Sequence, residues 1–264
     1  LRRLGVRVRV VRPASDHVTP DEVIPELNPR TRVLALDWVS YTGGSLIDLA
    51  TFGDLAHRHG GILVMDGTQG VGAVPLDLHA VPVDVMVVAG YKWLLGPYGT
   101  GFAYVRQDLQ ERLDLPVVNW MTVEGSEDFD SLPIDNFILP RAARIFDVPE
   151  TPNFINLHGM EASLEFVEQA GVQTVWEHCT RLNDRLAGGL RSRGFGLSDA
   201  ARPDHRSTIL GFQAESQEET TTLHRHLRAQ NIAVSLRHGF IRVSPYLYNN
   251  EDDIDRLLAA VGGL

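Results

Sequence analysis

Apolar and polar residues along the first hundred positions fall into blocks that have the lengths of strands and helices. Residues 33–40 form a largely apolar run, which is typical of a strand buried on both faces. A helix is predicted from Asp48 to the glycine pair at positions 60 and 61. Further strands are predicted at 62–66, 84–89 and 101–105. This succession of strand, helix and strand predicts a mainly parallel sheet covered by helices.

The pattern weakens beyond Gln107 and returns with a different organisation. Residues 107–154 are polar, acidic and low in periodicity, which predicts a long loop. A long helix is then predicted from about 159 to 193, with a break near Gly171. After it come a strand at 207–213, a helix at 217–230, a paired segment at 232–244 and a helix at 251–261. We therefore expect a large α/β domain over residues 1–150 and a smaller α+β domain over residues 151–264.

The opening segment and the overall charge narrow the class of protein. Valines at 6, 8 and 10 alternate with arginines, which predicts a half-buried strand. The net charge of −10 argues against binding to nucleic acid, which needs a basic face. No apolar run approaches the length of a membrane-spanning helix, and the opening residues do not form a signal peptide. The sequence thus predicts neither a nucleic-acid partner nor a membrane partner.

Cysteine and histidine usage gives no sign of a disulfide framework or a metal site. The single cysteine fits a reducing compartment, so we expect a cytoplasmic protein. Cys179 lies on the apolar face of the long helix, where core packing is the expected role. The ten histidines show no metal-ligand spacing, because the paired ones are two residues apart and point to different helix faces. No metal is predicted.

Candidate chemistry is concentrated at the ends of two predicted strands. Asp66 ends one strand, and Lys92 follows the next and precedes the glycine-rich loop LLGPYGTG. Ligands of open α/β sheets collect at such strand ends. A lysine can form a Schiff base with pyridoxal phosphate, whose pyridine nitrogen needs a fixed carboxylate to stay protonated. Lys92 is the only lysine in the chain, and arginine could not replace it in this role.

Two motifs carry a resemblance to a known family. DGTQ followed by GYKWLLGPYGTGF, and FIRVSPYLYNNEDDIDRLL at 240–258, resemble the class V aminotransferase family of fold-type-I pyridoxal phosphate enzymes. That family includes cysteine desulfurases, selenocysteine lyases, kynureninases and isopenicillin N epimerase-like proteins. The resemblance implies a fold-type-I large domain, incomplete at its N-terminus, followed by a small α+β domain.

The resemblance also implies roles for particular residues. Lys92 would form the internal aldimine and act as the base at the substrate's alpha carbon. Asp66 would partner the pyridine nitrogen, and Gln69 would neighbour the cofactor's phenolic oxygen. Arg242 would hold the substrate carboxylate, for which the bidentate geometry of arginine is suited.

Phosphate contacts are implied less directly. Tyr91 stands where relatives often have a histidine, and either its hydroxyl reaches the phosphate or its ring packs beside Trp93. The segment RIFDVPETPNF resembles the one that reaches the neighbouring subunit's phosphate, which implies a homodimer with Thr151 as the contact. Glu150 replaces the family's usual glycine there, and its carboxylate would repel a phosphate.

The implied function is a pyridoxal phosphate enzyme that acts on a small amino-acid substrate as a lyase, an epimerase or a transaminase. A persulfide-forming desulfurase is disfavoured, because no cysteine lies between Gln230 and Arg242. The alternative is a non-catalytic fragment or partner subunit that keeps the fold for assembly. The family's phosphate loop and ring-stacking residue would precede Leu1. We therefore expect a fragment, a processed chain or one part of a split enzyme that binds the cofactor poorly without a further N-terminal segment or chain.

Overall fold

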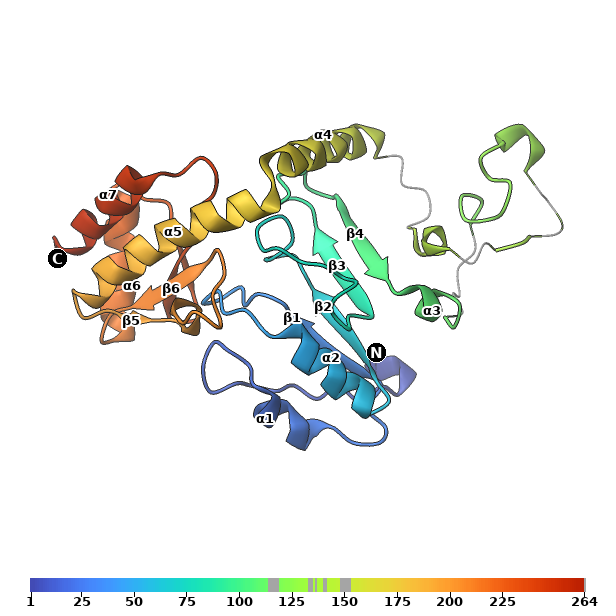
Figure 1. Cartoon of the computed structure of the whole chain (residues 1–264), viewed down its shortest axis with the longest axis horizontal. Helices are drawn as coiled ribbons and strands as arrows, with labels where there is room; N and C mark the ends of the chain where they lie inside the picture. The colour runs from blue at the N-terminus through green and yellow to red at the C-terminus, as the bar shows by residue number, and fades with distance from the viewer. Residues whose placement is uncertain (114–118, 133–134, 136, 140–141, 148–152, 264) are drawn as a thin grey trace.

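The described residues form two sheets with helices packed against them (Figure 1). The computed structural model describes residues 1–264 except 114–118, 133–134, 136, 140–141, 148–152 and 264. The first sheet contains β1 (Val33–Asp37), β2 (Ile62–Asp66), β3 (Val85–Ala89) and β4 (Gly101–Val105) in that order. The second has the order β5-β6-β8-β7, from β5 (Gly196–Leu197), β6 (Leu210–Gln213), β7 (Ser235–Arg237) and β8 (Phe240–Val243).

The helices are α1 (Pro20–Val23), α2 (Leu49–Arg58), α3 (Gln107–Gln110), α4 (Phe154–Ala170), α5 (Val172–Arg191), α6 (Gln217–Ala229) and α7 (Glu251–Val261). Short 3-10 turns occur at η1 (Arg2–Leu4), η2 (Ile24–Glu26), η3 (Phe129–Ser131), η4 (Ala143–Phe146) and η5 (Asp199–Ala201). Among the described helices, none is both long enough and apolar enough to cross a membrane.

The first sheet is mainly parallel, as the sequence predicts. β1 pairs with β2 and β2 with β3 in parallel, and β4 runs antiparallel to β3. Asp37 is the partner of Asp66, and Asp66 is the partner of Val87. The carboxyl ends of β1, β2 and β3 therefore meet at one edge of the sheet. The predicted start of α2 is also confirmed, since the Asp48 side chain accepts from the Ala50 amide at 3.1 Å.

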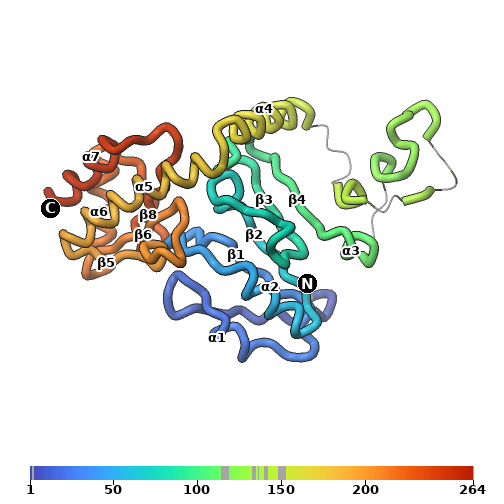
Figure 2. The backbone as a smooth tube through the Cα atoms, viewed as in Figure 1, coloured from blue at the N-terminus to red at the C-terminus, as the bar shows by residue number. Residues whose placement is uncertain are grey.

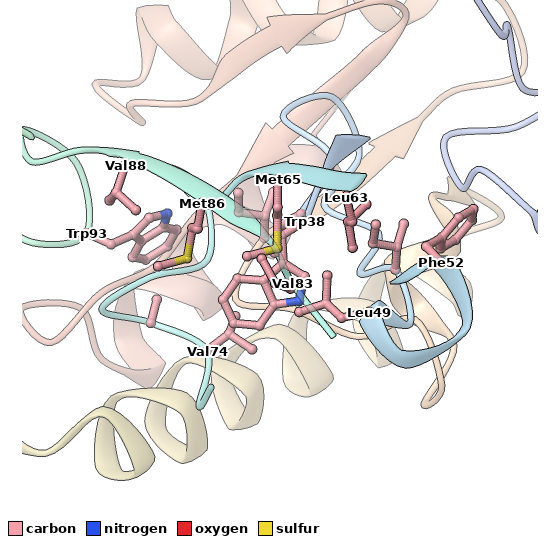
Figure 3. Close-up of a cluster of buried hydrophobic side chains, with 14 of the residues drawn as sticks. Trp38, Leu49, Phe52, Leu63, Met65, Val74, Val83, Met86, Val88 and Trp93 are labelled. Atoms are coloured by element: carbon pink, nitrogen blue, oxygen red, sulfur yellow. The ribbon is translucent and has the colours of Figure 1, made fainter. Parts of the chain in front are cut away.

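A buried apolar cluster supports this sheet (Figure 3). Leu63 and Met65 of β2 are completely buried within it, together with Phe52 of α2. Trp38 packs so tightly over the turn after β2 that a Cβ on Gly70 would lie 2.4 Å from its ring. Fully burying a side chain such as Leu63, Met65 or Phe52 stabilises the fold by roughly 1.5–3 kcal/mol. The strand end that carries Asp66 is thus anchored by the core.

Two predictions about strands are wrong. β1 is not buried on both faces, because its residues alternate between exposed and half-buried positions. Leu34 and Leu36 pack on the core, whereas Val33 on the opposite face is 52 % exposed. Residues 6–10 belong to no strand, and their valines are exposed. Alternation favours an extended backbone, but a strand also needs a partner, which the alternating pattern alone does not supply.

Helix α5 connects the two sheets (Figure 2). Val175 and Cys179 pack in the cluster of the first sheet, and Leu182 and Leu190 pack in a second cluster under the antiparallel β5–β8 sheet. The predicted break is confirmed at Gly171, which has φ 79° between α4 and α5. The strand predicted at 207–213 is shorter and begins at Leu210.

Candidate active site

Asp66 lies at the strand-end edge of the first sheet, held by the turn that follows it. The Thr68 amide donates to Asp66 Oδ1 at 2.8 Å, which fixes the carboxylate. The Thr68 hydroxyl accepts from the Ala89 amide at 3.1 Å and so joins this turn to the end of β3. Gln69, the next residue, is only 8 % exposed.

A second carboxylate lies beside Asp66. Asp37 ends β1 and is paired in register with Asp66. Asp37 keeps an exposed surface, yet burial of its carboxyl and then repulsion from Asp66 raise its pKa, while Lys92 opposes the shift. The sequence analysis did not identify Asp37, although its position at the end of a strand paired with β2 was the available signal.

Lys92 follows β3 in a tight loop. The Leu95 amide donates to the Lys92 carbonyl at 3.0 Å, and the Gly96 amide donates to the Gly90 carbonyl at 2.8 Å. Leu95 has φ 58°, a left-handed conformation that is uncommon for a leucine and often marks a functional segment. This loop fixes the backbone that carries the lysine.

The environment of Lys92 shifts the titration of its amine toward the neutral form. Burial lowers the pKa of Lys92, and Arg242 lowers it further, whereas Asp66 and Asp37 act in the opposite direction. A neutral amine is the nucleophilic form. The lysine thus lies within electrostatic range of carboxylates from one sheet and of arginines from the other.

Tyr91 and Trp93 pack with different partners on either side of Lys92. The Tyr91 ring stacks on Tyr98 with centroids 4.5 Å apart, and Lys92 Nζ lies 5.9 Å from the centroid of Tyr91. Trp93 packs edge-on against Tyr246, whose hydroxyl donates to the Trp93 carbonyl at 2.9 Å. A contact between the Tyr91 hydroxyl and a phosphate stays a prediction.

Arg242 belongs to β8 of the second sheet. One Nη donates to the Tyr41 carbonyl at 2.7 Å, and Nε is buried without a hydrogen-bond partner among the described residues. Burial and then Arg237 lower the pKa of Arg242. The Tyr41 hydroxyl lies 2.7 Å from His238 Nε2, so this hairpin contacts the segment after β1 at two points. A buried donor without a partner is rare and marks a position where a ligand oxygen would fit.

The sequence analysis also named Thr151, Glu150 and Cys179. Thr151 and Glu150 are outside the described residues. Cys179 is completely buried, and burial raises the pKa of its thiol to about 12. The expected core role of Cys179 agrees with this burial.

The arrangement fits pyridoxal phosphate on chemical grounds. It offers an amine whose pKa is lowered, a carboxylate fixed on the neighbouring strand end, and a guanidinium whose buried Nε has no partner among the described residues. These are the groups that a carbonyl cofactor with a basic ring nitrogen and a carboxylate substrate require.

Comparison with known proteins agrees with this chemistry. The sequence model of the family described as Aminotransferase class-V matches residues 1–257. The chain therefore belongs to the class-V aminotransferase family, a family of pyridoxal phosphate-dependent enzymes with an α/β fold.

Individual relatives within the family are named for different activities. The chain is 26% identical to a probable cysteine desulfurase of Methanothermobacter thermautotrophicus, over 97% of this chain and 66% of the relative. It is 28% identical to an isopenicillin N epimerase of Amycolatopsis lactamdurans, over 98% of this chain and 68% of the relative. The chain thus spans about two thirds of the length of these curated relatives.

Solved structures show the same fold. The apo structure of a cysteine desulfurase from Thermococcus onnurineus NA1 matches with a TM-score of 0.80 at 19% identity, covering 100% of this chain and 68% of that one. The cystine C-S lyase C-DES, in complex with cysteine persulfide, matches with a TM-score of 0.78 at 21% identity, covering 92% of this chain and 64% of that one.

Proposed function

We propose that the protein is a pyridoxal phosphate-dependent enzyme acting on an amino acid, with Lys92 as the residue that holds the cofactor covalently. The observation that carries the proposal is the environment of the chain's only lysine, within electrostatic range of Asp66 of β2 and Arg242 of β8. When bound, pyridoxal phosphate withdraws electrons from the substrate carbon whose bond is broken.

Each neighbouring residue has a defined task in this proposal. Asp66 would keep a proton on the ring nitrogen, and Gln69 would donate to the phenolic oxygen. Tyr91 and Thr151 would bind the phosphate. Arg242 binds the alpha-carboxylate of the substrate through its unpartnered guanidinium edge. Lys92 would move the proton at the alpha carbon of the substrate.

The reaction type follows from what the chain can supply. Cysteine desulfurases and an isopenicillin N epimerase are both among the relatives. A persulfide-forming desulfurase needs an accessible thiolate. Cys179 is completely buried with a pKa raised to about 12, and no cysteine lies between Gln230 and Arg242. We therefore favour a lyase, an epimerase or a transaminase.

We also propose a homodimer in the cytoplasm, with domains at 1–150 and 151–264. Exposed apolar residues on α4, among them Phe154 and Ile155, support an interface with another copy. The single cysteine supports a reducing compartment. The second hydrophobic cluster consists only of residues from Leu182 onward, which supports a separate C-terminal domain.

Covalent labelling of Lys92 tests the proposed function. The protein is incubated with pyridoxal phosphate, reduced with borohydride and digested, and the pyridoxyl group is located by mass spectrometry. We expect the label on the peptide that contains Lys92, and no label there in a Lys92→Ala variant. Turnover of that variant should fall by about a hundredfold to ten-thousandfold, the range typical of a lost acid–base group. A wild-type protein without label on Lys92 would contradict the proposal.

A further inference from the structure

Arg237 and Arg242 lie on the same face of the second sheet. In the antiparallel pair β7–β8, Ser235 is opposite Arg242 and Arg237 is opposite Phe240. Side chains alternate between the two faces along each strand, so Arg237 shares a face with Ser235 and therefore with Arg242. The two arginines are diagonal neighbours, which places their Cα atoms roughly 7–8 Å apart.

The hairpin that carries both arginines is held against the segment after β1. Arg242 donates to the Tyr41 carbonyl at 2.7 Å, and His238, next to Arg237, lies 2.7 Å from the Tyr41 hydroxyl. His238 itself has φ 42°, so the turn after β7 adopts an unusual conformation. Arg237 therefore belongs to a strand of a hairpin that is held against the segment after β1.

Arg237 has no carboxylate partner among the described residues. Its side chain is exposed, and its one hydrogen bond goes to the neighbouring Leu236 carbonyl at 3.2 Å. Arg185, by contrast, binds Asp255 through two hydrogen bonds of 2.7 Å each. The positive charge of Arg237 is therefore not paired with a carboxylate of any described residue.

Charges around the site are distributed unequally. Asp37 and Asp66 raise the pKa of Lys92, while burial and then Arg237 lower the pKa of Arg242. Arg237 also lowers the pKa of Lys92, so it lies within electrostatic range of the reacting centre. The carboxylates are on the lysine side, and the second sheet presents two arginines together.

We propose that Arg237 forms a subsite for a second acidic group, so that the substrate is an amino acid whose side chain ends in a carboxylate or a similar anion. This inference rests on the proposed function, in which Arg242 takes the alpha-carboxylate. The planar guanidinium of Arg237 can bind a carboxylate with two hydrogen bonds. A substrate with an apolar side chain would leave this cation without a partner beside another cation, which disfavours its binding.

Titration calorimetry with simple acids tests the subsite. Succinate and glutarate are compared with butyrate and valerate, the monocarboxylates of equal length, on the purified protein incubated with pyridoxal phosphate. A charge-assisted hydrogen bond contributes about 1.5–3 kcal/mol, so the better dicarboxylate should bind about tenfold tighter or more. Arg237→Gln should remove this preference and leave monocarboxylate affinity unchanged, and Arg237→Lys should keep part of it.

Arg228→Gln is the matched control, since it removes one exposed arginine from α6 and should retain the full preference. Equal binding of both acid classes to the wild type, or a preference that survives Arg237→Gln, would overturn the subsite. Inorganic phosphate is added as a competitor. If phosphate displaces the dicarboxylate at comparable concentration, and does so only when Arg237 is present, Arg237 binds phosphate and the proposed subsite is overturned.

Two further readouts separate this inference from the proposed function. Catalytic efficiency with glutamate or aspartate should exceed that with norvaline or alanine. Arg237→Gln should reduce this difference in catalytic efficiency by raising KM for the acidic amino acids. Pyridoxyl labelling of Lys92 is measured on the same samples. Labelling without an acidic preference removes only the subsite, whereas absence of labelling removes the proposed function.

Discussion

The two sides of the candidate site are built in different ways. Asp66 and Lys92 come from one short stretch of chain, at the ends of adjacent parallel strands supported by a buried core. Arg237 and Arg242 come from an antiparallel hairpin far along the sequence, which meets the first side through Tyr41. The first side is fixed by regular structure, and the second by a contact between two sheets. This difference suggests that the first side determines the chemistry and the second determines which substrate is held.

The two sides also differ in how far their supporting side chains are exposed. Met65 and Met86, which lie beneath the first side, are 0% and 3% exposed. Tyr41, which receives the hairpin, is 42% exposed. A rigid support suits groups that must be aligned to within fractions of an ångström, and a contact between sheets can adjust around a ligand.

The largest expected effect comes from the lysine side. Asp66→Asn keeps the shape and the hydrogen bond from the Thr68 amide, but it removes the charge that would hold a proton on the ring nitrogen. Turnover should fall by about a hundredfold or more while the cofactor still binds. Steady-state kinetics and the visible absorption of the cofactor measure the two properties separately.

Asp77→Asn is a matched control for this substitution. Asp77 is also exposed and also accepts from the amide two residues later, His79, at 2.9 Å. It lies away from the strand ends, so turnover should stay at the wild-type level. Unchanged turnover in a cofactor-loaded Asp66→Asn protein would mean that Asp66 has only a structural role.

The same difference explains how much could be predicted from sequence. Asp66 and Lys92 were identifiable because both follow apolar strands in one continuous stretch. Asp37 was missed, since its proximity to Asp66 depends on the register between β1 and β2. Arg237 was missed because its shared face with Arg242 depends on the pairing of β7 with β8. Pairing register is a long-range property that the hydrophobic pattern of one strand does not encode.

Local sequence patterns predicted the ends of helices better than they predicted the burial and pairing of strands. The start of α2 at Asp48 and the break at Gly171 depend on residues within one turn, and both are confirmed. The burial of β1 and the strand at 6–10 depend on what packs against them, and both predictions are wrong.

On the arginine side the expected effect is smaller. Arg242→Lys keeps the charge and loses the planar fork, so substrate affinity should weaken about tenfold with little change in turnover. The comparison is KM against kcat for the amino-acid substrate. Arg256→Lys, which alters another guanidinium that donates to a carbonyl, is the control. A turnover loss as large as that of Asp66→Asn would contradict the division between the two sides.

The smallest expected effect is a shift in the pKa of Lys92. Measuring this pKa compares the influence of the lysine side and of the arginine side on one group. Only the neutral amine reacts with an acylating reagent, so the pH midpoint of Lys92 acylation in cofactor-free protein reports its pKa. Burial and Arg242 lower this pKa from 10.5, and Asp66 raises it. Arg242→Gln removes a repelling cation and should move the midpoint to higher pH, whereas Asp66→Asn removes an attracting anion and should move it to lower pH. Peptide mapping of acylated Lys92 across a pH series gives all three midpoints. Shifts in the same direction, or no shift with either variant, would show that the lysine does not lie between the two sides in solution.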